Sequence, residues 1–396
     1  MTRKIRLGLL FGGRSAEHEV SLMSARSVMK AINKEKYEVT LIGITKEGKW
    51  VVEDPRQGAG EDPLTALSAG DVGNMSEAAL LGEPGKRELL ALSDRQGVAD
   101  PSPDGDLRRP GAERAPKRAV QLSTIAELDV LFPLLHGPYG EDGTVQGLLE
   151  LADLPYVGSG VLGSSVAMDK ALCKELLRAA GIPVVDWLLV WRSEIERDPE
   201  AVARRAEARF TYPIFTKPAN LGSSVGVVKA HDHAELVEAL QESARYDRRV
   251  LIERGVNARE IEVSVLGNDA PEASVVGEII PGREFYDYEA KYLDENSQLL
   301  IPAPIPPDTA ERAREYAIRA FKAIDAAGLA RVDYLLDRDS GELYLSEINT
   351  LPGFTQISMY PKLWEASGLS YGELIDRLVE LALERQAEKD RTVKKR

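Results

Sequence analysis

The sequence predicts an α/β protein whose N-terminal part is a doubly wound parallel sheet, and two observations carry that prediction. Short apolar stretches suited to strands alternate with amphipathic stretches suited to helices along the first third of the chain. Leu128–Leu135 is almost entirely apolar, as in strands that helices cover on both faces. At 396 residues the chain is also long for one hydrophobic core, which predicts two or three domains.

The first domain, expected at residues 1–157, alternates strands and helices around one long interruption. In chain order the expected elements are strand Ile5–Phe11, helix Glu17–Asn33, strand Tyr37–Thr45, strand Leu128–Leu135 and helix Gly143–Leu151. The interruption, about residues 53–120, is rich in Gly, Pro and charged residues, which can form little core. We therefore expect a partly mobile insertion with one short helix at Glu77–Leu81, ended by Gly82.

Two further domains are expected at residues 158–256 and 257–396. The elements expected in the second domain are helices 165–180, 199–208 and 234–244 and strands 184–191, 214–217, 225–229 and 250–253. Those expected in the third are strands 260–266 and 273–280, helix 308–327, a hairpin over 331–349 and a last helix 371–388.

Composition limits the class of function. The formal net charge is −14 at pH 7, which disfavours general nucleic-acid binding. No apolar run approaches the roughly 18 residues of a membrane span. The apolar start of the chain ends at Gly12, too soon for a signal peptide. Cys173 is the only cysteine, so no internal disulfide can form, as in a cytoplasmic protein. We expect neither a nucleic acid nor a membrane as partner.

The hairpin over 331–349 carries the most informative pattern in the chain. If it folds about its turn-rich centre, Asp333 faces Glu347 and Arg331 faces Asn349. Cross-strand Cβ atoms lie only about 5 Å apart, and facing carboxylates repel each other unless a cation lies between them. Hard oxygen ligands of this kind suit Mg²⁺ or Mn²⁺. The pattern favours a metal site, and a solvated charged face is the alternative.

Strict alternation assigns the remaining hairpin side chains to two faces. The apolar face is expected to carry Val332, Tyr334, Leu336, Tyr344 and Ile348. The face of the metal candidates is expected to carry Leu335, Leu343 and Leu345 nearer the turn.

Lys217–Gly226 is a Gly- and Ser-rich loop between two expected strands. Its glycines let the backbone approach a phosphate, and successive N–H groups can form an anion-binding nest. Lys217 adds a point charge at the end of the preceding strand. The Walker A pattern is absent, so a nucleoside triphosphate would need a different fold from the P-loop class. An ordinary surface hairpin is the alternative interpretation.

A second glycine pattern, Gly158–Gly163, matches G-x-G-x-x-G, with Asp186 at a suitable distance beyond it. Dinucleotide binding is therefore one hypothesis, and a dehydrogenase is the corresponding function. The pattern lies in mid-chain at an expected domain junction, which favours a hinge.

Three other loops are candidates for a small-molecule pocket. Glu17 and His136 each follow a strand of the first domain, at the sheet edge where open α/β sheets bind ligands. Glu17 at a helix start could hold an ammonium group. Glu284–Tyr292 is dense in aromatic and charged residues, which suits a lid that excludes water or, equally, an edge strand.

Together these segments resemble the D-alanine–D-alanine ligases of the ATP-grasp superfamily. The matching segments are Gly12–Ser21, His136–Gly147, Met168–Lys170, Lys217–Gly226, Phe285–Tyr292 and Arg331–Ser358. They occur in the family's order and cover the chain except for about residues 53–120. The resemblance implies a three-domain ATP-grasp architecture and an ATP-dependent carboxylate–amine ligase.

The resemblance also implies a role for individual residues. Lys170, Lys217 and Lys291 are expected at the ATP phosphates with the loop that carries Ser223 and Ser224, Glu253 and Val256 at the adenine, and Glu260 at the ribose. Asp333, Glu347 and Asn349 are expected to hold two Mg²⁺ ions. Glu17, supported by Ser223 and Tyr292, is expected at the first D-alanine, Ser358 at the second, and His136 in the same pocket. Arg331 and the Gly353 N–H are expected to stabilise the tetrahedral oxyanion.

The implied reaction forms an acyl phosphate from the first D-alanine and ATP, which the amine of the second D-alanine then attacks. Tyr292 argues for D-alanine as second substrate, because relatives that prefer D-lactate lack a tyrosine there. Two rivals stay open: a related ligase with D-lactate or D-serine as acceptor, and a non-catalytic nucleotide-binding protein on the same scaffold. We also expect a homodimer, although the residues themselves do not determine the oligomeric state.

Overall fold

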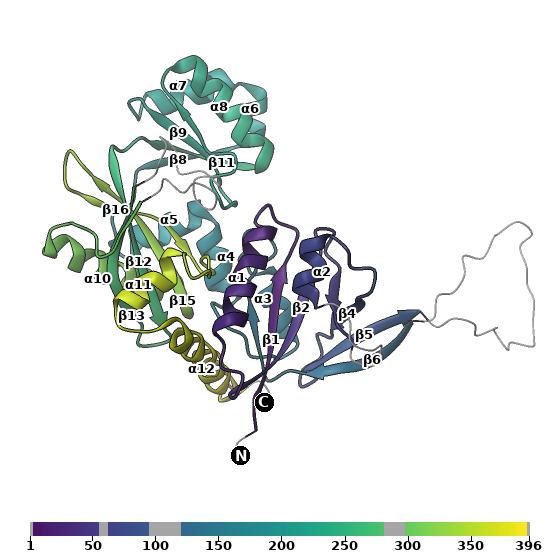
Figure 1. Cartoon of the computed structure of the whole chain (residues 1–396). Coiled ribbons are helices and arrows are strands. Elements are labelled where there is room, and N and C mark those ends of the chain that lie inside the picture. The colour runs from purple at the N-terminus through teal and green to yellow at the C-terminus, as the bar shows by residue number, and fades with distance from the viewer. Residues whose placement is uncertain (1–2, 55–61, 95–119, 281–297, 394–396) are drawn as a thin grey trace, which may run out of the picture.

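The computed structural model describes residues 3–54, 62–94, 120–280 and 298–393 (Figure 1). Three sheets organise the chain, with seven, four and five strands. Each sheet lies within one of the three expected domain ranges, and the domain bounds themselves stay a prediction. Among the described helices, none combines the length and apolar character that a membrane crossing requires.

The parallel core of the first sheet confirms the α/β prediction. β1 (Ile5–Gly12) lies between β2 (Tyr37–Ile44) and β7 (Val130–Pro133) and runs parallel to both. Helices α1 (His18–Ala31) and α3 (Thr144–Leu151) follow β1 and β7. All the side chains of β7 are buried, as its apolar sequence predicts.

The expected insertion extends this sheet with antiparallel strands, which is a correction. The added elements are β3 (Trp50–Val52), α2 (Pro63–Ala69), β4 (Ser76–Leu80), β5 (Glu88–Asp94) and β6 (Val120–Glu127). The predicted helix at Glu77–Leu81 is wrong, because Ser76, Ala78 and Leu80 are buried on one face of β4 while Glu77 is exposed. Burial of that alternating face against the sheet outweighs the helix propensity of Glu and Ala. Residues 55–61 and 95–119 of the insertion lie outside the described residues.

The second sheet has the order β10-β9-β11-β8 and is antiparallel. Its elements are β8 (Trp187–Trp191), α6 (Arg192–Arg197), α7 (Pro199–Glu207), β9 (Ile214–Pro218), β10 (Val228–Ala230), α8 (His233–Tyr246) and β11 (Arg249–Arg254). The helix expected at 165–180 is in fact two, α4 (Val161–Met168) and α5 (Lys170–Ala179). Asp169 separates them with extended backbone and accepts a hydrogen bond from the Leu172 N–H at 3.1 Å, capping α5.

The third sheet has the order β14-β13-β12-β15-β16. Its elements are β12 (Ala258–Gly267), β13 (Glu272–Ile280), β14 (Gln298–Leu300), α10 (Pro307–Ala323), β15 (Gly328–Asp337), β16 (Leu343–Asn349), α11 (Met359–Ala366) and α12 (Tyr371–Asp390). Ser370 and Glu373 form a reciprocal capping box that starts α12.

The predicted hairpin register is confirmed at its functional end. Asp333 pairs with Glu347 and Arg331 with Asn349, but the register shifts between Asp333 and Tyr334. Beyond the shift, Leu345 pairs with Tyr334. The predicted faces near the turn are therefore wrong for β16: Leu343 and Leu345 are buried with Val332, Tyr334 and Leu336, while Tyr344 pairs with Leu335 on the other face. A bulge adds one residue to a strand and so reverses the faces beyond it.

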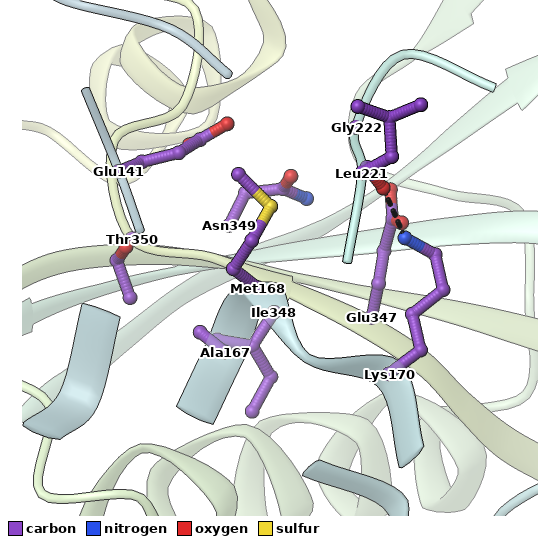
Figure 2. Close-up of a pocket in the computed structure, with 10 residues that line it drawn as sticks. All are labelled: Glu141, Ala167, Met168, Lys170, Leu221, Gly222, Glu347, Ile348, Asn349 and Thr350. Atoms are coloured by element: carbon purple, nitrogen blue, oxygen red, sulfur yellow. Dashed lines mark hydrogen bonds between the residues drawn. The ribbon is translucent and has the colours of Figure 1, made fainter. Parts of the chain in front are cut away.

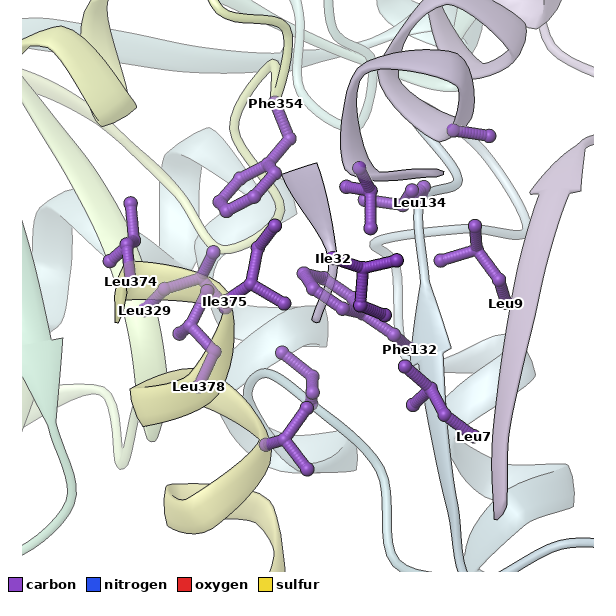
Figure 3. Packing of buried hydrophobic residues seen from close by; sticks show 14 of the residues in the cluster. Leu7, Leu9, Ile32, Phe132, Leu134, Leu329, Phe354, Leu374, Ile375 and Leu378 are labelled. Atoms are coloured by element: carbon purple, nitrogen blue, oxygen red, sulfur yellow. The ribbon is translucent and has the colours of Figure 1, made fainter. Parts of the chain in front are cut away.

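One apolar cluster ties the first domain to the C-terminal helix (Figure 3). Leu7 and Phe132 from the first sheet and Leu374 and Leu378 from α12 belong to it. The Phe354 ring, 1% exposed, lies between the two groups and meets the Phe132 ring edge-on at 5.4 Å. The loop after β16 is thereby held against the first domain.

Candidate active site

A pocket lies between segments of the three expected domains (Figure 2). Residues from all three expected domains line it: Glu141, Ala167, Met168, Lys170, Leu221, Gly222, Glu347, Ile348, Asn349 and Thr350. The sequence predicts ligand contacts both for the loop after β9 and for the end of β16. These two segments, far apart in the sequence, line the same pocket.

Arg331 sits at the centre of a buried charge cluster beside this pocket. Its Nε and Nη2 donate to the two carboxylate oxygens of Asp333, each at 2.7 Å. Its Nε is also 3.0 Å from Oε2 of Glu262, on the adjacent strand β12. Although burial opposes the charged form, Asp333 and Glu262 keep the pKa of Arg331 well above its ordinary value. Glu262 is a member that sequence reasoning missed, because only the pairing of β12 with β15 brings it here.

The donor chemistry at the end of the hairpin fits a divalent cation. Asp333 and Glu347 are directly opposite in the register, and Glu262 adds a third carboxylate against the single guanidinium of Arg331. The Asn349 Nδ2 donates to Oδ2 of Asp333 at 2.9 Å, which leaves the amide oxygen of Asn349 as the atom that can bind a metal. Within the described ranges no three His, Cys, Asp or Glu side chains converge as a metal site by themselves. The predicted set depends on the amide and on ligands from a substrate, as Mg²⁺ sites often do.

The loop after β9 has the backbone of an anion site. Ser223 (φ 51°), Ser224 (φ 56°) and Gly226 (φ 71°) are left-handed. Lys170 donates through its side chain to the Leu221 carbonyl oxygen and through its backbone N–H to the Ala219 carbonyl at 2.8 Å. Left-handed turns of this kind aim successive N–H groups into a concavity. The structure thus brings Lys170 to the predicted phosphate loop.

Lys217 and Glu253 form a buried ion pair at 2.7 Å behind that loop. Lys174, which the sequence interpretation missed, lies 3.0 Å from the other Glu253 oxygen. Although burial opposes ionisation, the two ammonium groups lower the pKa of Glu253 to about 2. The strand that carries Glu253 ends at Arg254, and the linker after it holds Val256 before β12 begins with Glu260 near its start. The three residues thus follow one another along the segment from β11 to β12, and their predicted contacts with a nucleotide stay a prediction.

Two carboxylates stand close together on the first-domain side of the pocket. Glu17, only 8% exposed, lies so near Gly137 that a Cβ there would be 2.9 Å from its Oε2. Glu141 accepts a hydrogen bond from the Gly137 N–H at 2.9 Å. Burial, then the charges of Glu17 and Glu347, raise the pKa of Glu141 to about 8. A positive charge bound among them would relieve that repulsion, so the pocket is matched to cationic groups.

His136 is buried and bonds the loop after β16 rather than facing the pocket. Its Nδ1 lies 3.0 Å from the Leu351 carbonyl, which can only accept, so Nδ1 carries the proton. Burial lowers the pKa of His136, which keeps the ring neutral. The free Nε2 then accepts from the Ser24 hydroxyl at 3.4 Å, and Ser24 Oγ accepts from the Phe354 N–H at 3.3 Å. This relay joins α1 to the loop that carries Gly353.

The other predicted residues fall into two groups. Ser358 precedes α11 and its Oγ lies 2.8 Å from Oγ1 of Thr355, in the same loop as the buried Gly353. Lys291, Tyr292 and the whole predicted lid lie outside the described residues.

The glycines of Gly158–Gly163 serve packing. A Cβ on Gly163 would lie 2.7 Å from the Asp325 carbonyl oxygen, and one on Gly328 would lie 3.1 Å from the Gly158 nitrogen. Close contact between α4 and the start of β15 therefore accounts for the pattern, which supports the domain-junction interpretation over dinucleotide binding.

Family models match both halves of the chain: one described as "D-ala D-ala ligase N-terminus" over residues 6–159 and one described as "D-ala D-ala ligase C-terminus" over residues 176–380. The chain belongs to the D-alanine–D-alanine ligase family. This confirms the predicted resemblance, and with it the prediction of an ATP-dependent ligase of the ATP-grasp class.

Curated relatives agree over nearly the full length of this ligase. The D-alanine–D-alanine ligase of Acetivibrio thermocellus is 50% identical over 385 residues, 97% of each chain. That of Thermoanaerobacter sp. (strain X514) is 49% identical over 389 residues, 98% of this chain and 99% of the relative.

Solved structures agree as well. The D-alanine-D-alanine ligase from Coxiella burnetii has a TM-score of 0.78 at 34% identity, covering 98% of this chain and 97% of that one. The VanG D-Ala:D-Ser ligase from Enterococcus faecalis has a TM-score of 0.78 at 33% identity, covering 96% of this chain and 100% of that one. The fold therefore does not distinguish the second substrate.

Proposed function

We propose that this ligase joins two D-alanine molecules into D-alanyl-D-alanine through an acyl phosphate, with release of ADP and phosphate, for peptidoglycan precursor synthesis. The observation that carries the proposal is the acidic pocket between the phosphate loop and the hairpin, in a chain half identical to curated D-alanine–D-alanine ligases. The use of ATP and the single cysteine support a cytoplasmic enzyme.

ATP binds between the second and third domains in this proposal. Lys170, Lys217 and Lys291 contact its phosphates, and the N–H groups of the loop at Ser223 and Ser224 face the same oxygens. Glu253 and Val256 contact the adenine, and Glu260 contacts the ribose. Support comes from the left-handed backbone of the loop and from the hydrogen bond that the Lys170 side chain, at the start of α5, donates to the loop at the Leu221 carbonyl.

Asp333, Glu347 and Asn349 would hold two Mg²⁺ ions, which Mn²⁺ could replace. Bound there, the ions would neutralise the charge that develops on the transferred phosphoryl group. The opposed carboxylates of β15 and β16 support this assignment.

The amino acids occupy the first-domain side of the pocket. Glu17 holds the ammonium of the first D-alanine, with Ser223 and Tyr292 in support, and Ser358 binds the carboxylate of the second. The first carboxylate attacks the γ-phosphorus; the amine of the second D-alanine then attacks the acyl phosphate carbonyl, loses a proton and expels phosphate. Arg331 and the Gly353 N–H stabilise the oxyanion of that step. His136 acts through the loop that carries Gly353.

Phosphate release from ATP, with mass analysis of the product, tests the activity directly. D-alanine is expected to stimulate phosphate release and to give D-alanyl-D-alanine. The same assay with a mixture of D-alanine and D-serine, or D-alanine and D-lactate, decides between acceptors. A product that joins D-alanine to D-serine or to D-lactate, formed in preference to D-alanyl-D-alanine, would contradict the proposed second substrate.

A D-serine acceptor is the second candidate, because the VanG D-Ala:D-Ser ligase matches this fold as well as the D-alanine ligase from Coxiella burnetii does. We expect Tyr292→Phe to shift acceptor preference from D-alanine toward D-lactate, since relatives that prefer D-lactate lack a tyrosine at this position. Competition between the two acceptors, read by mass, measures the shift. Unchanged preference would remove Tyr292 from the site.

The relay from Ser24 to Phe354 should matter to turnover. Ser24→Ala is expected to lower kcat roughly 2- to 10-fold, because a hydrogen bond contributes about 0.5–1.5 kcal/mol to the position of the loop. Ser27→Ala, on the same helix, is the matched control, since its hydroxyl donates to the Met23 carbonyl within α1. Equal kcat for the two variants would show that the relay does not position Gly353.

We also propose a homodimer, which light scattering of the purified protein measures directly. A monomeric mass at assay concentration would contradict it.

A further inference from the structure

Lys174 is a buried lysine beside the proposed nucleotide site that has no assigned role. Its side chain is 3% exposed, and its Nζ lies 3.0 Å from Oε1 of Glu253 and 3.3 Å from the Val185 carbonyl oxygen. The Trp187 ring centroid is 5.5 Å away. Burial of an ammonium group is costly unless a counter-charge compensates it. Burial lowers the pKa of Lys174, and the adjacent Glu253 carboxylate opposes that shift by favouring the charged form. The contact with Glu253 is therefore the place to look for a use of this lysine.

A second lysine, Lys217, contacts the other carboxylate oxygen of Glu253 and suggests what the charge of Lys174 does. Lys217 contacts the second carboxylate oxygen at 2.7 Å, and its side chain is 18% exposed. Of the two lysines, Lys217 is therefore the more accessible to a ligand. One carboxylate between two ammonium groups leaves one net positive charge, and the more exposed lysine can present it to a ligand.

We propose that Lys174 is a positioning residue that neutralises Glu253, so that the ammonium of Lys217 stays available to the nucleotide phosphates. The inference rests on the proposed phosphate role of Lys217. Without Lys174, the negative charge of Glu253 is balanced by Lys217 alone. The net charge of the cluster then falls from +1 to zero, and the attraction of Lys217 to Glu253 competes with its attraction to a phosphate. Attraction between close charges is strong where solvent is excluded, so losing this positive charge should weaken the binding of the nucleotide phosphates.

A double-mutant cycle with Glu253 tests this. Lys174→Met is expected to raise KM for ATP roughly tenfold, which corresponds to about 1.4 kcal/mol, and to leave KM for D-alanine unchanged. Glu253→Gln removes the charge that Lys174 offsets but keeps a hydrogen-bond acceptor. In the Glu253→Gln background, Lys174→Met should therefore leave KM for ATP at the value of Glu253→Gln alone, because the charge that Lys174 offsets is already gone.

A merely structural Lys174 predicts a different result. Its loss would lower the melting temperature without a selective change in KM for ATP, or would change KM for ATP by the same factor with and without Glu253→Gln. Either pattern overturns the proposal. If Lys174→Met does not fold, Lys174→Gln replaces it with the same expected outcome, since the amide still donates to the Val185 carbonyl.

Lys217→Met separates this inference from the proposed function. A large rise in KM for ATP in Lys217→Met, with no change in Lys174→Met, overturns only the role of Lys174. An unchanged KM for ATP in Lys217→Met removes the phosphate role of Lys217 and this inference with it, while product analysis still reports the ligase activity independently.

Discussion

Glu347→Gln is expected to lower kcat by about 10²- to 10⁴-fold while leaving the protein folded. Metal neutralisation of phosphoryl charge supplies several kcal/mol, and each ~1.4 kcal/mol is tenfold in rate. Gln has nearly the shape of Glu but lacks the negative charge that would help to hold the metal ions. Glu347 lies in register opposite Asp333 and lines the pocket. Loss of its charge therefore weakens the metal site without opening a cavity.

Turnover at several Mg²⁺ and Mn²⁺ concentrations and the melting temperature measure the two halves of this prediction. Glu342→Gln is the matched control, because Glu342 is exposed just before β16 and its carboxylate accepts a hydrogen bond from the nearby Tyr344 hydroxyl at 3.2 Å. We expect it to retain full activity. A Glu347→Gln enzyme with normal turnover would refute the metal role of the hairpin.

Arg331→Met is expected to lower both stability and activity. The guanidinium is shared between Asp333 and Glu262, and all three side chains are largely buried. Removing one partner of a buried ion pair costs about 3–5 kcal/mol, because the remaining carboxylates are left without a counter-charge. Loss of an oxyanion donor should lower kcat of the remaining folded enzyme by about 10²–10³.

Urea unfolding and turnover per folded molecule separate the two effects. The control is Arg259→Met, which breaks a comparable fork in the same sheet: Arg259 contacts Glu278 through Nε at 2.7 Å and Nη2 at 2.6 Å. We expect that variant to lose stability but keep kcat. If Arg331→Met kept the kcat of the control, Arg331 would have no part in the chemistry.

The functional half of the hairpin could be predicted because its determinants are local. Turn residues between two alternating segments set which residues face each other, so the predicted pairing of Asp333 with Glu347 is correct. The shift after Asp333 could not be predicted in the same way. Whether Leu345 or Tyr344 turns inward depends on what covers that face, and Leu345 is buried against the core of the third domain.

In the insertion, the local sequence did not predict the secondary structure. Its composition correctly indicates an interruption, but Ser76–Leu80 forms a strand because the edge of β3 and the strand β5 are there to pair with it. A short segment of Glu, Ala and Leu can form either element, and its neighbours decide which.

The sequence by itself determined the family and the pairing of Asp333 with Glu347, since both depend on continuous segments with their own local geometry. The nucleotide loop, the metal ligands and the role of Glu17 are predictions from segments of the same kind. Only the tertiary structure decided that Glu262 shares Arg331, that Lys174 meets Glu253, and that His136 bonds the loop after β16. These partners are far apart in the chain. Their pairing follows from burial, because a charge or imidazole removed from water must find its counterpart in whatever strand or helix packs against it.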